Sequence, residues 1–306
     1  MFLNRSIVLM VAAVLAPGAL AQDYPRTSDG KPDFQGVWSS AWLTPLERPP
    51  QATSLILSPS EAEALFQTLW AERDARDPLG PLESIDVRSL VIVDGRARSS
   101  LIVDPADGKL PLTAAARARR GPPPLPGLDG PEQRPPPERC NVTSNAVAPL
   151  FVLPAGNMRQ IVQTPDHFMA LAETYGIARV IPLKDGVPAP AASGRGRWEG
   201  DTLVIETSGF AETDRIRVAP YANFPISPRS KIVERFQRTS RDEILYSFTV
   251  EDSALYTAPW TAEMSLLRSD EKIYEWACHE GNYAMSNMLR GARLEEQRAA
   301  AKDKRK

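Results

Sequence analysis

The chain has 306 residues, of which 42% are hydrophobic and 24% are charged, and its formal net charge is −2 at pH 7. This length allows one large domain or two small ones, and it can bury a substantial core without metals or many disulfides. Acidic and basic residues are mixed along the chain, and no basic stripe of the kind that binds nucleic acid is present. We therefore expect no nucleic-acid partner.

The N-terminus has the features of a cleaved signal peptide over residues 1–21. Arg5 gives a short basic region, residues 7–15 form an apolar run, and residues 19–21 fit the small-x-small cleavage pattern. The apolar run is too short to span a bilayer. A permanent N-terminal anchor is the alternative. We expect an exported protein, periplasmic or secreted, that is not inserted in the membrane after cleavage.

The two cysteines, Cys140 and Cys278, predict one disulfide, because an exported chain meets an oxidising environment. Closing so long a loop stabilises the fold by about 5 kcal/mol if the effect is treated as chain entropy. The alternative is a nucleophilic Cys278 thiol beside His279. Neighbouring residues on a strand point to opposite faces, so they are poor hydrogen-bond partners.

The first secondary-structure signals after the signal peptide are a strand and a helix. "DFQGVWSSAW" is typical of a strand bounded by glycine and proline residues. "LSPSEAEALFQTLWAERDARD" predicts a helix with Ser58 as its N-cap. Pro59 takes the first helical position, and Glu61 completes a capping box.

A hairpin and a proline-rich segment come next. In "VRSLVIVDGRARSSLIVDP", two apolar runs flank Asp94-Gly95, a favoured pair for tight turns. Residues 121–137 read "GPPPLPGLDGPEQRPPP", which is typical of an extended surface loop. This segment could link two domains. We prefer a loop on a single domain over residues 22–306, because Cys140 follows it and is expected to pair with Cys278.

The second half of the chain predicts strands almost throughout. Residues 158–182 predict three short strands, and "GRGRWEGDTLVIETSGF" predicts a hairpin. Residues 230–278 predict a meander of four strands that ends with "EKIYEWAC". Short antiparallel strands at about ten-residue spacing predict a mainly β protein, either a barrel or a sandwich. Residues 284–303 predict a C-terminal helix.

The alternation of residues within this meander is clear. One strand places four bulky apolar side chains on the same face, namely Ile244, Tyr246, Phe248 and Val250. We expect this face to be buried.

Several motifs of the chain resemble a widespread group of uncharacterised exported bacterial proteins. They are "QIVQTPDHF", "GRWEGDTLVIET", "FTVEDSALYTAPWTAE" and "YEWACHEGNYAMSNMLRGAR", and the resemblance covers most of residues 88–295. The resemblance implies export, and it carries no activity or residue roles. "DFQGVW" also looks like the first-strand signal of lipocalin-type barrels. The early helix and the proline-rich segment depart from that pattern.

His279, with the adjacent Glu280, is the first candidate for chemistry. On a strand, Glu275, Ala277 and His279 would share one polar face, which would pair with a face that includes Glu263. This face either covers the core against solvent or lines a polar cavity. In the second case, His279 with a carboxylate could transfer protons near neutral pH.

His167, preceded by Asp166, is the second candidate. "TPDHF" is typical of a turn between two strands, and this is the simpler interpretation. A metal site would require the two histidines to converge, and the sequence has no paired motif such as H-x-H or H-E-x-x-H. We expect no metal and no cofactor.

Aromatic residues gather in the last third of the chain and suggest either a core or a ligand cavity. The residues selected as ligand-binding candidates are Trp260, Tyr246, Glu263 and Tyr283.

Two functions follow from these observations. The first is an exported β-barrel that binds a small, partly apolar molecule. The second is an acid–base enzyme without a cofactor, a lyase, isomerase or hydrolase that uses His279 and a carboxylate. The first is preferred, because the chain has only two histidines and neither lies in a known motif. Protein partners are left open, and an accessory role beside an outer-membrane protein is a third possibility.

Overall fold

The computed structural model describes residues 24–40, 42–76, 89–119, 128, 130–133, 139–140, 148–150, 158–189, 192, 194–212, 216–219 and 222–303. The predicted signal peptide lies outside these residues, and so does most of the proline-rich segment. The helices and strands are, in chain order, β1 (Gly36–Ser39), α1 (Pro59–Arg76), β2 (Ile92–Val93), β3 (Arg96–Ala97), β4 (Ile102–Asp104), α2 (Ala114–Ala118), β5 (Met158–Gln163), β6 (His167–Ala172), β7 (Ile177–Pro182), β8 (Arg195–Glu199), β9 (Thr202–Thr207), β10 (Ile216–Ala219), β11 (Ala222–Pro225), β12 (Lys231–Arg238), β13 (Glu243–Glu251), β14 (Trp260–Ser269) and α3 (Ala284–Asp303).

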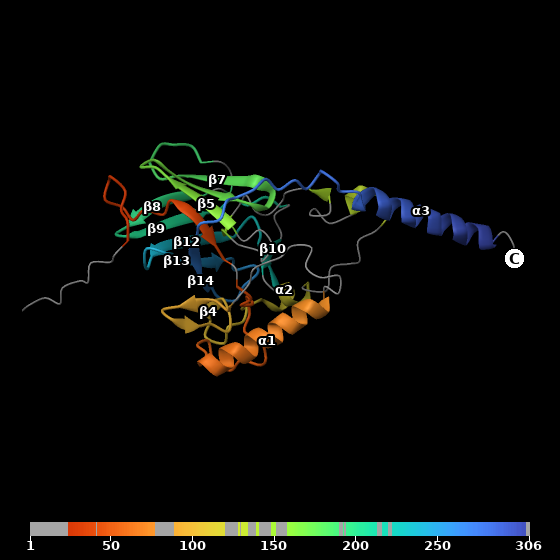
Figure 1. Cartoon of the computed structure of the whole chain (residues 1–306), viewed down its shortest axis with the longest axis horizontal. Helices are drawn as coiled ribbons and strands as arrows, with labels where there is room; N and C mark the ends of the chain where they lie inside the picture. Colours follow the sequence, from red (N-terminus) through yellow and green to blue (C-terminus); the bar gives the residue numbers. More distant parts are fainter. Residues whose placement is uncertain are drawn as a thin grey trace, which may run out of the picture.

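One large antiparallel sheet dominates the described part of the chain, so the prediction of a mainly β protein is confirmed (Figure 1). Its strand order is β7-β6-β5-β1-β14-β13-β12-β9-β8, and β4 pairs with β14 beside this path. Strand β1 lies between the two halves, because it pairs with β5 on one edge and with β14 on the other. The three strands over residues 158–182 and the β8–β9 hairpin are also as predicted.

The prediction of a fourth strand in the last meander is wrong. Residues 270–278, which follow β14, form neither a strand nor a helix. Strand β14 is already paired along both edges, with β13 on one side and with β1 and β4 on the other. No edge of β14 is free to pair with the segment that follows it. Strand alternation therefore does not set the direction of Glu275, Ala277 or His279.

Helix α1 begins as predicted and packs on a small core of its own. The Ser58 backbone N–H donates to the Glu61 carboxylate at 2.8 Å, and the Glu61 N–H donates to the Ser58 hydroxyl at 3.4 Å. The helix lies on the same side of the sheet as the β2–β3 hairpin (Figure 1). The buried leucines of this small core are Leu43, Leu57, Leu65, Leu69 and Leu90.

The β2–β3 hairpin turns at the predicted pair. Asp94 and Gly95 have φ angles of 50° and 70°, and a two-residue turn of this kind requires positive φ at both positions. Ile92 pairs with Ala97, and Val93 pairs with Arg96. The predicted hairpin is confirmed.

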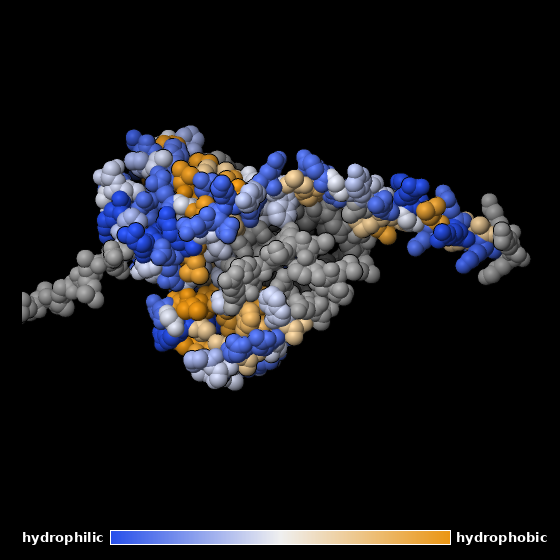
Figure 2. Space-filling view, viewed as in Figure 1, coloured by the Kyte–Doolittle hydropathy of each residue, from blue (hydrophilic) through white to orange (hydrophobic). Residues whose placement is uncertain are grey.

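The C-terminal helix α3 projects away from the sheet, and its surface is mostly hydrophilic (Figures 1 and 2). Its bounds match the predicted residues 284–303.

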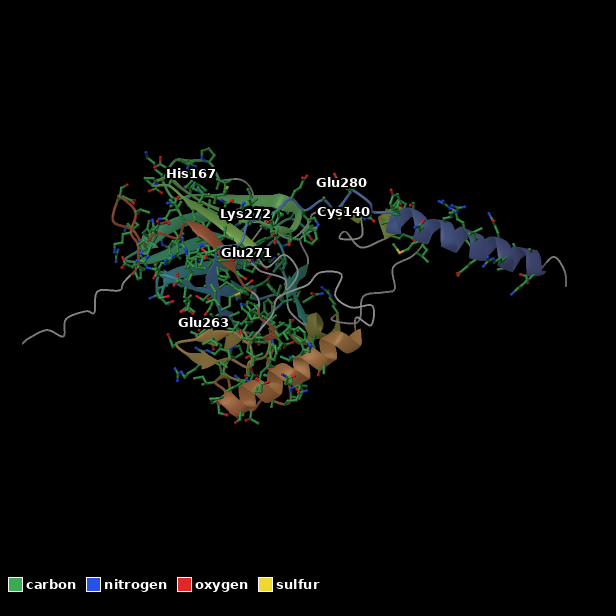
Figure 3. All side chains as sticks on the ribbon, in the orientation of Figure 1. Cys140, His167, Glu263, Glu271, Lys272 and Glu280 are labelled. Carbon is green, nitrogen blue, oxygen red and sulfur yellow. A yellow bond between two sulfur atoms is a disulfide. The ribbon has the colours of Figure 1, made fainter. Side chains whose placement is uncertain are left out.

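The predicted disulfide is also confirmed, because Cys140 and Cys278 are bonded with a Cα–Cα distance of 5.6 Å. The bond closes a sequence separation of 138 residues and lies close to the start of α3 (Figure 3).

Among the described residues, no helix has the length and apolar character needed to cross a membrane.

The two ends of the sheet, β7 and β8, approach each other through side chains. Arg195 of β8 donates to the carbonyl groups of Lys184 and Val187, which follow β7. A Cβ at Gly196 would clash with the side chain of Leu183. The sheet therefore curves back on itself, and its inner face encloses the main core.

The main core has the predicted face of β13 at its centre. Four residues of β13 are 0% exposed, namely Ile244, Tyr246, Phe248 and Val250. The residues that alternate with them are partly exposed, and Glu251 at the end of the strand is exposed. Phe236 and Trp260, on the neighbouring strands β12 and β14, are buried in the same cluster. The expected burial of this face is confirmed.

Candidate functional site

The structure places His279 on the surface. The residue lies in the turn between the disulfide and α3, where its carbonyl accepts from the Asn282 N–H at 3.3 Å. Both His279 and Glu280 are exposed. Among the described residues, no hydrogen bond or ion pair joins the imidazole of His279 to a carboxylate.

His167 is the first residue of β6 and has a structural role at the β5–β6 turn. Its N–H donates to the Thr164 hydroxyl at 3.0 Å, and the Thr164 N–H donates to the His167 carbonyl at 2.9 Å. The Asp166 carboxylate is 3.9 Å from the Lys184 ammonium, with both side chains exposed. These contacts match the turn interpretation.

The two histidines do not converge. His167 lies at one end of the sheet, whereas Glu280, the neighbour of His279, lies close to Cys140 near α3 (Figure 3). Within the described part of the chain, no group of three or more His, Cys, Asp or Glu side chains could hold a metal ion.

The four ligand-binding candidates lie in three different places. Trp260 and Tyr246 are 0% exposed and share the main core. The Glu263 carboxylate lies on the outer face of β14, 4.0 Å from the guanidinium of Arg98. Tyr283 is 72% exposed, at the start of α3. The structure therefore brings together only Trp260 and Tyr246.

A buried polar network surrounds the carboxylate of Glu234 on β12. Arg179 of β7 donates to both carboxylate oxygens, at 2.9 and 2.6 Å. The Tyr246 hydroxyl and the Leu150 backbone N–H donate to one of these oxygens, at 2.8 and 2.7 Å. The guanidinium of Arg179 also donates to the hydroxyl of Thr207 on β9, at 3.0 Å. Five separate segments of the chain thus meet at one ion pair.

The burial of this network affects the protonation of its members. Burial raises the pKa of Tyr246 well above its usual value, and the negative charge of Glu234 raises it further. Tyr246 therefore stays neutral, and its hydroxyl donates a hydrogen bond to the Glu234 carboxylate. Burial lowers the pKa of Arg159, another inward-facing side chain, to about 10, so Arg159 remains charged at neutral pH.

An aromatic layer adjoins the polar network. The Phe248 ring lies 6.0 Å from the Tyr246 ring and 5.6 Å from the Trp260 ring, measured between centroids. Phe224 and Tyr256 lie 5.0 and 5.8 Å from Trp260, with interplanar angles of 84° and 59°. The edge-to-face packing of Phe224 on Trp260 is favourable for an aromatic pair. Only the Trp260 N–H is without a hydrogen-bond partner among the polar atoms described in this layer.

A hollow of about 350 Å³ opens beside this layer, at the turn between β13 and β14. Residues 251–253 and 256–259 line it together with Arg229 and Lys231. Tyr256 belongs to both the hollow and the aromatic layer, and its hydroxyl donates to the Pro225 carbonyl at 2.6 Å. This volume is at the lower end of the range that holds small ligands.

An acidic group in the wall of the hollow is fully engaged in local structure. Asp252 accepts from the hydroxyl groups of Ser227 and Ser230, at 2.5 and 2.7 Å, and from the Ala254 N–H at 2.9 Å. These bonds fix the turn that carries Tyr256.

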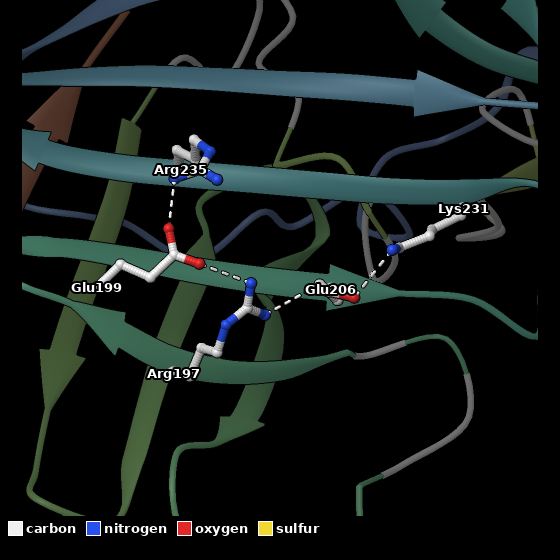
Figure 4. A network of polar contacts seen from close by, with 5 residues as sticks. All are labelled: Arg197, Glu199, Glu206, Lys231 and Arg235. Atoms are coloured by element: carbon white, nitrogen blue, oxygen red, sulfur yellow. Dashed lines mark hydrogen bonds and ion pairs between the residues drawn. The ribbon is translucent and has the colours of Figure 1, made fainter. Parts of the chain in front are cut away.

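The outer face of β8, β9 and β12 carries a chain of ion pairs (Figure 4). Glu206 lies between Lys231 and Arg197, at 3.1 and 2.5 Å. Glu199 lies between Arg197 and Arg235, at 2.7 and 2.9 Å. The positive and negative side chains of this surface network pair with one another, so the network does not form a site for an ion.

Comparison with known proteins gives no relative: no family model, no curated protein and no solved structure matches the chain.

Sequence reasoning missed Arg179 and Glu234. A detectable signal was present, because "KIVERFQR" places Glu234 between Ile232 and Phe236 on the same strand face. A charged residue at such a position indicates a buried partner.

Tyr246→Phe should lower the free energy of unfolding by about 1.5–3 kcal/mol, because a buried carboxylate loses one of its donors. Tyr256→Phe is the matched control, since its hydroxyl donates to a neutral carbonyl, and we expect a loss of about 1 kcal/mol. Urea titration of both variants measures the difference. A Tyr246→Phe variant that loses no more stability than Tyr256→Phe would contradict the importance assigned to the network.

Glu206→Gln should reduce stability near neutral pH but not in acid. Hydrogen bonds from Lys231 and then Arg197 lower the pKa of Glu206. The stabilisation is therefore present above the unfolded pKa of about 4.3 and is lost as the pH falls through the folded value. Urea titrations from pH 7 to pH 2 should show the wild-type advantage shrinking, and salt should reduce it at pH 7. Glu271→Gln, at an exposed position without a described ion pair, is the control.

Proposed function

We propose that the protein is an exported binding protein for a small, partly apolar molecule. The observation that carries this proposal is the position of the hollow, whose wall includes Tyr256, against the aromatic layer around Trp260. Ligand sites are typically concave, lined by aromatic side chains and supplied with a few polar groups. The wall of the hollow supplies charged and hydroxyl groups beside Tyr256, Ala258 and Pro259, and the aromatic layer that Tyr256 joins supplies apolar surface.

The positions of the histidines favour binding over acid–base catalysis. A catalytic His279 would need to lie in a concave site within hydrogen-bond reach of a carboxylate. His279 is instead exposed, and the hollow is lined by neither histidine. We therefore do not propose the lyase, isomerase or hydrolase activity.

Three observations support export to the periplasm or beyond. The first 21 residues have the pattern of a signal peptide, and the motifs resemble those of exported bacterial proteins. The Cys140–Cys278 disulfide suits an oxidising compartment. We also propose that the sheet forms a barrel, because Arg179 and Arg195 link its two ends.

Binding can be tested with N-phenyl-1-naphthylamine, a neutral aromatic probe whose fluorescence rises in apolar sites. We expect saturable binding in the micromolar range to the protein purified with its disulfide intact. Ala258→Trp should weaken binding at least tenfold, because residue 258 lines the hollow and the larger side chain would fill it.

Ala254→Trp provides the matched control. Residue 254 is exposed in the same turn but lies outside the wall of the hollow. We expect this variant to bind the probe as the wild type does. Equal binding by the wild type and Ala258→Trp, or no saturable binding at all, would contradict the proposed site.

A further inference from the structure

The indole N–H of Trp260 is a buried donor that the fold leaves unused. The Trp260 side chain is 0% exposed, and its Nε1 has no hydrogen-bond partner among the described residues. Buried N–H groups are nearly always paired in native proteins, because losing water without gaining an acceptor opposes folding. An unpaired donor in an aromatic layer is the kind of group that orients a ligand.

The surroundings of this donor limit the chemistry of a ligand. Among the described residues, the rings of Phe224, Phe248 and Tyr256 pack against Trp260, and none of these three carries a charge. The Tyr256 hydroxyl is engaged by the Pro225 carbonyl. The layer therefore presents apolar walls and a hydrogen-bond donor that can receive an acceptor.

We propose that the ligand is an uncharged molecule with an aromatic or alicyclic body and a carbonyl oxygen that accepts from Trp260 Nε1–H. This inference rests on the proposed binding function and specifies its ligand class. Tyr256 lines the hollow and its ring packs against Trp260, so the inference requires this ring to move aside for the carbonyl group of a ligand in the hollow to reach the donor.

A charged ligand fits this location poorly. A carboxylate would lose its hydration among three uncharged rings, and this loss is unfavourable unless a cation compensates it. The lining of the hollow has no excess of positive charge, because it contains Glu251 and Asp252 as well as Arg229 and Lys231. Lys231 is also paired with Glu206 on the outer face, at 3.1 Å.

Two naphthalenes of similar size test the inference: 2-acetylnaphthalene, which has a carbonyl group, and 2-ethylnaphthalene, which does not. We expect the ketone to bind the wild-type protein at least about tenfold more tightly, as measured by displacement of N-phenyl-1-naphthylamine. 2-Naphthoate should bind more weakly than the ketone. Trp260→Phe removes the N–H and keeps an aromatic ring, so this variant should bind the ketone and 2-ethylnaphthalene with about equal affinity.

The outcomes separate this inference from the proposed function. If both neutral probes bind the wild type equally, the site binds apolar molecules but the Trp260 donor is not used, and the inference is overturned. The same holds if 2-naphthoate binds most tightly, or if Trp260→Phe keeps the preference for the ketone. If neither neutral probe displaces N-phenyl-1-naphthylamine, the inference is overturned, and the proposed function fails as well only if N-phenyl-1-naphthylamine itself does not bind.

A measurement on the wild-type protein avoids any folding defect of the variant. The chain has six tryptophans, so the indole ¹H–¹⁵N resonances can be resolved and the one from Trp260 assigned. Adding 2-acetylnaphthalene should move the proton shift of this resonance downfield, because the N–H forms a new hydrogen bond. Adding 2-ethylnaphthalene should cause no downfield change. A resonance that responds alike to both compounds would refute the inference.

Discussion

The ion pair between Arg179 and Glu234 is the constraint on which the rest of the structure depends. Arg179 lies on β7, at one end of the sheet, and its partners Thr207 and Glu234 lie on β9 and β12 near the other end. Taking two charges out of water is costly, so a buried pair persists only when geometry and further hydrogen bonds compensate it. The bidentate contact, the Tyr246 hydroxyl and the Leu150 N–H provide this compensation. The pair thus favours the curved arrangement of the sheet over an open one, in which both charges would lack partners or return to water.

The interior of the sheet contains a polar network around the ion pair and an aromatic layer beside it. Around the ion pair, both carboxylate oxygens of Glu234 accept hydrogen bonds, which suits a structural role. In the adjoining aromatic layer, the Trp260 N–H has no hydrogen-bond partner among the described residues, and Tyr256, which packs against Trp260, also lines the hollow. The polar network and the aromatic layer are connected through Tyr246 and Phe248, two inward-facing residues of β13 whose ring centroids are 6.0 Å apart. The aromatic layer therefore packs directly against the network that holds the ion pair.

Much of the fold could be predicted from local sequence patterns. The capping box at Ser58, the Asp94-Gly95 turn and the alternation along β13 each depend on a few neighbouring residues, and each was predicted correctly. The fourth strand of the meander was wrong because pairing is decided at long range, where β1 and β4 already occupy the edge of β14. The same limit applies to the site. Tyr246 and Trp260 were selected for their chemistry, but the partner of Glu234 lies 55 residues away on β7, and local periodicity cannot supply it.

A double-mutant cycle on Arg179 and Glu234 tests the central claim most directly. The free energies of unfolding of the wild type, Arg179→Met, Glu234→Gln and the double variant would be measured by urea titration. Each single change should cost about 3–5 kcal/mol, because it leaves one buried charge without its partner. The double variant should lose far less than the sum, with a coupling energy of about 2–3 kcal/mol. Losses that add to within about 0.5 kcal/mol would mean that the two side chains act independently, and would contradict the account.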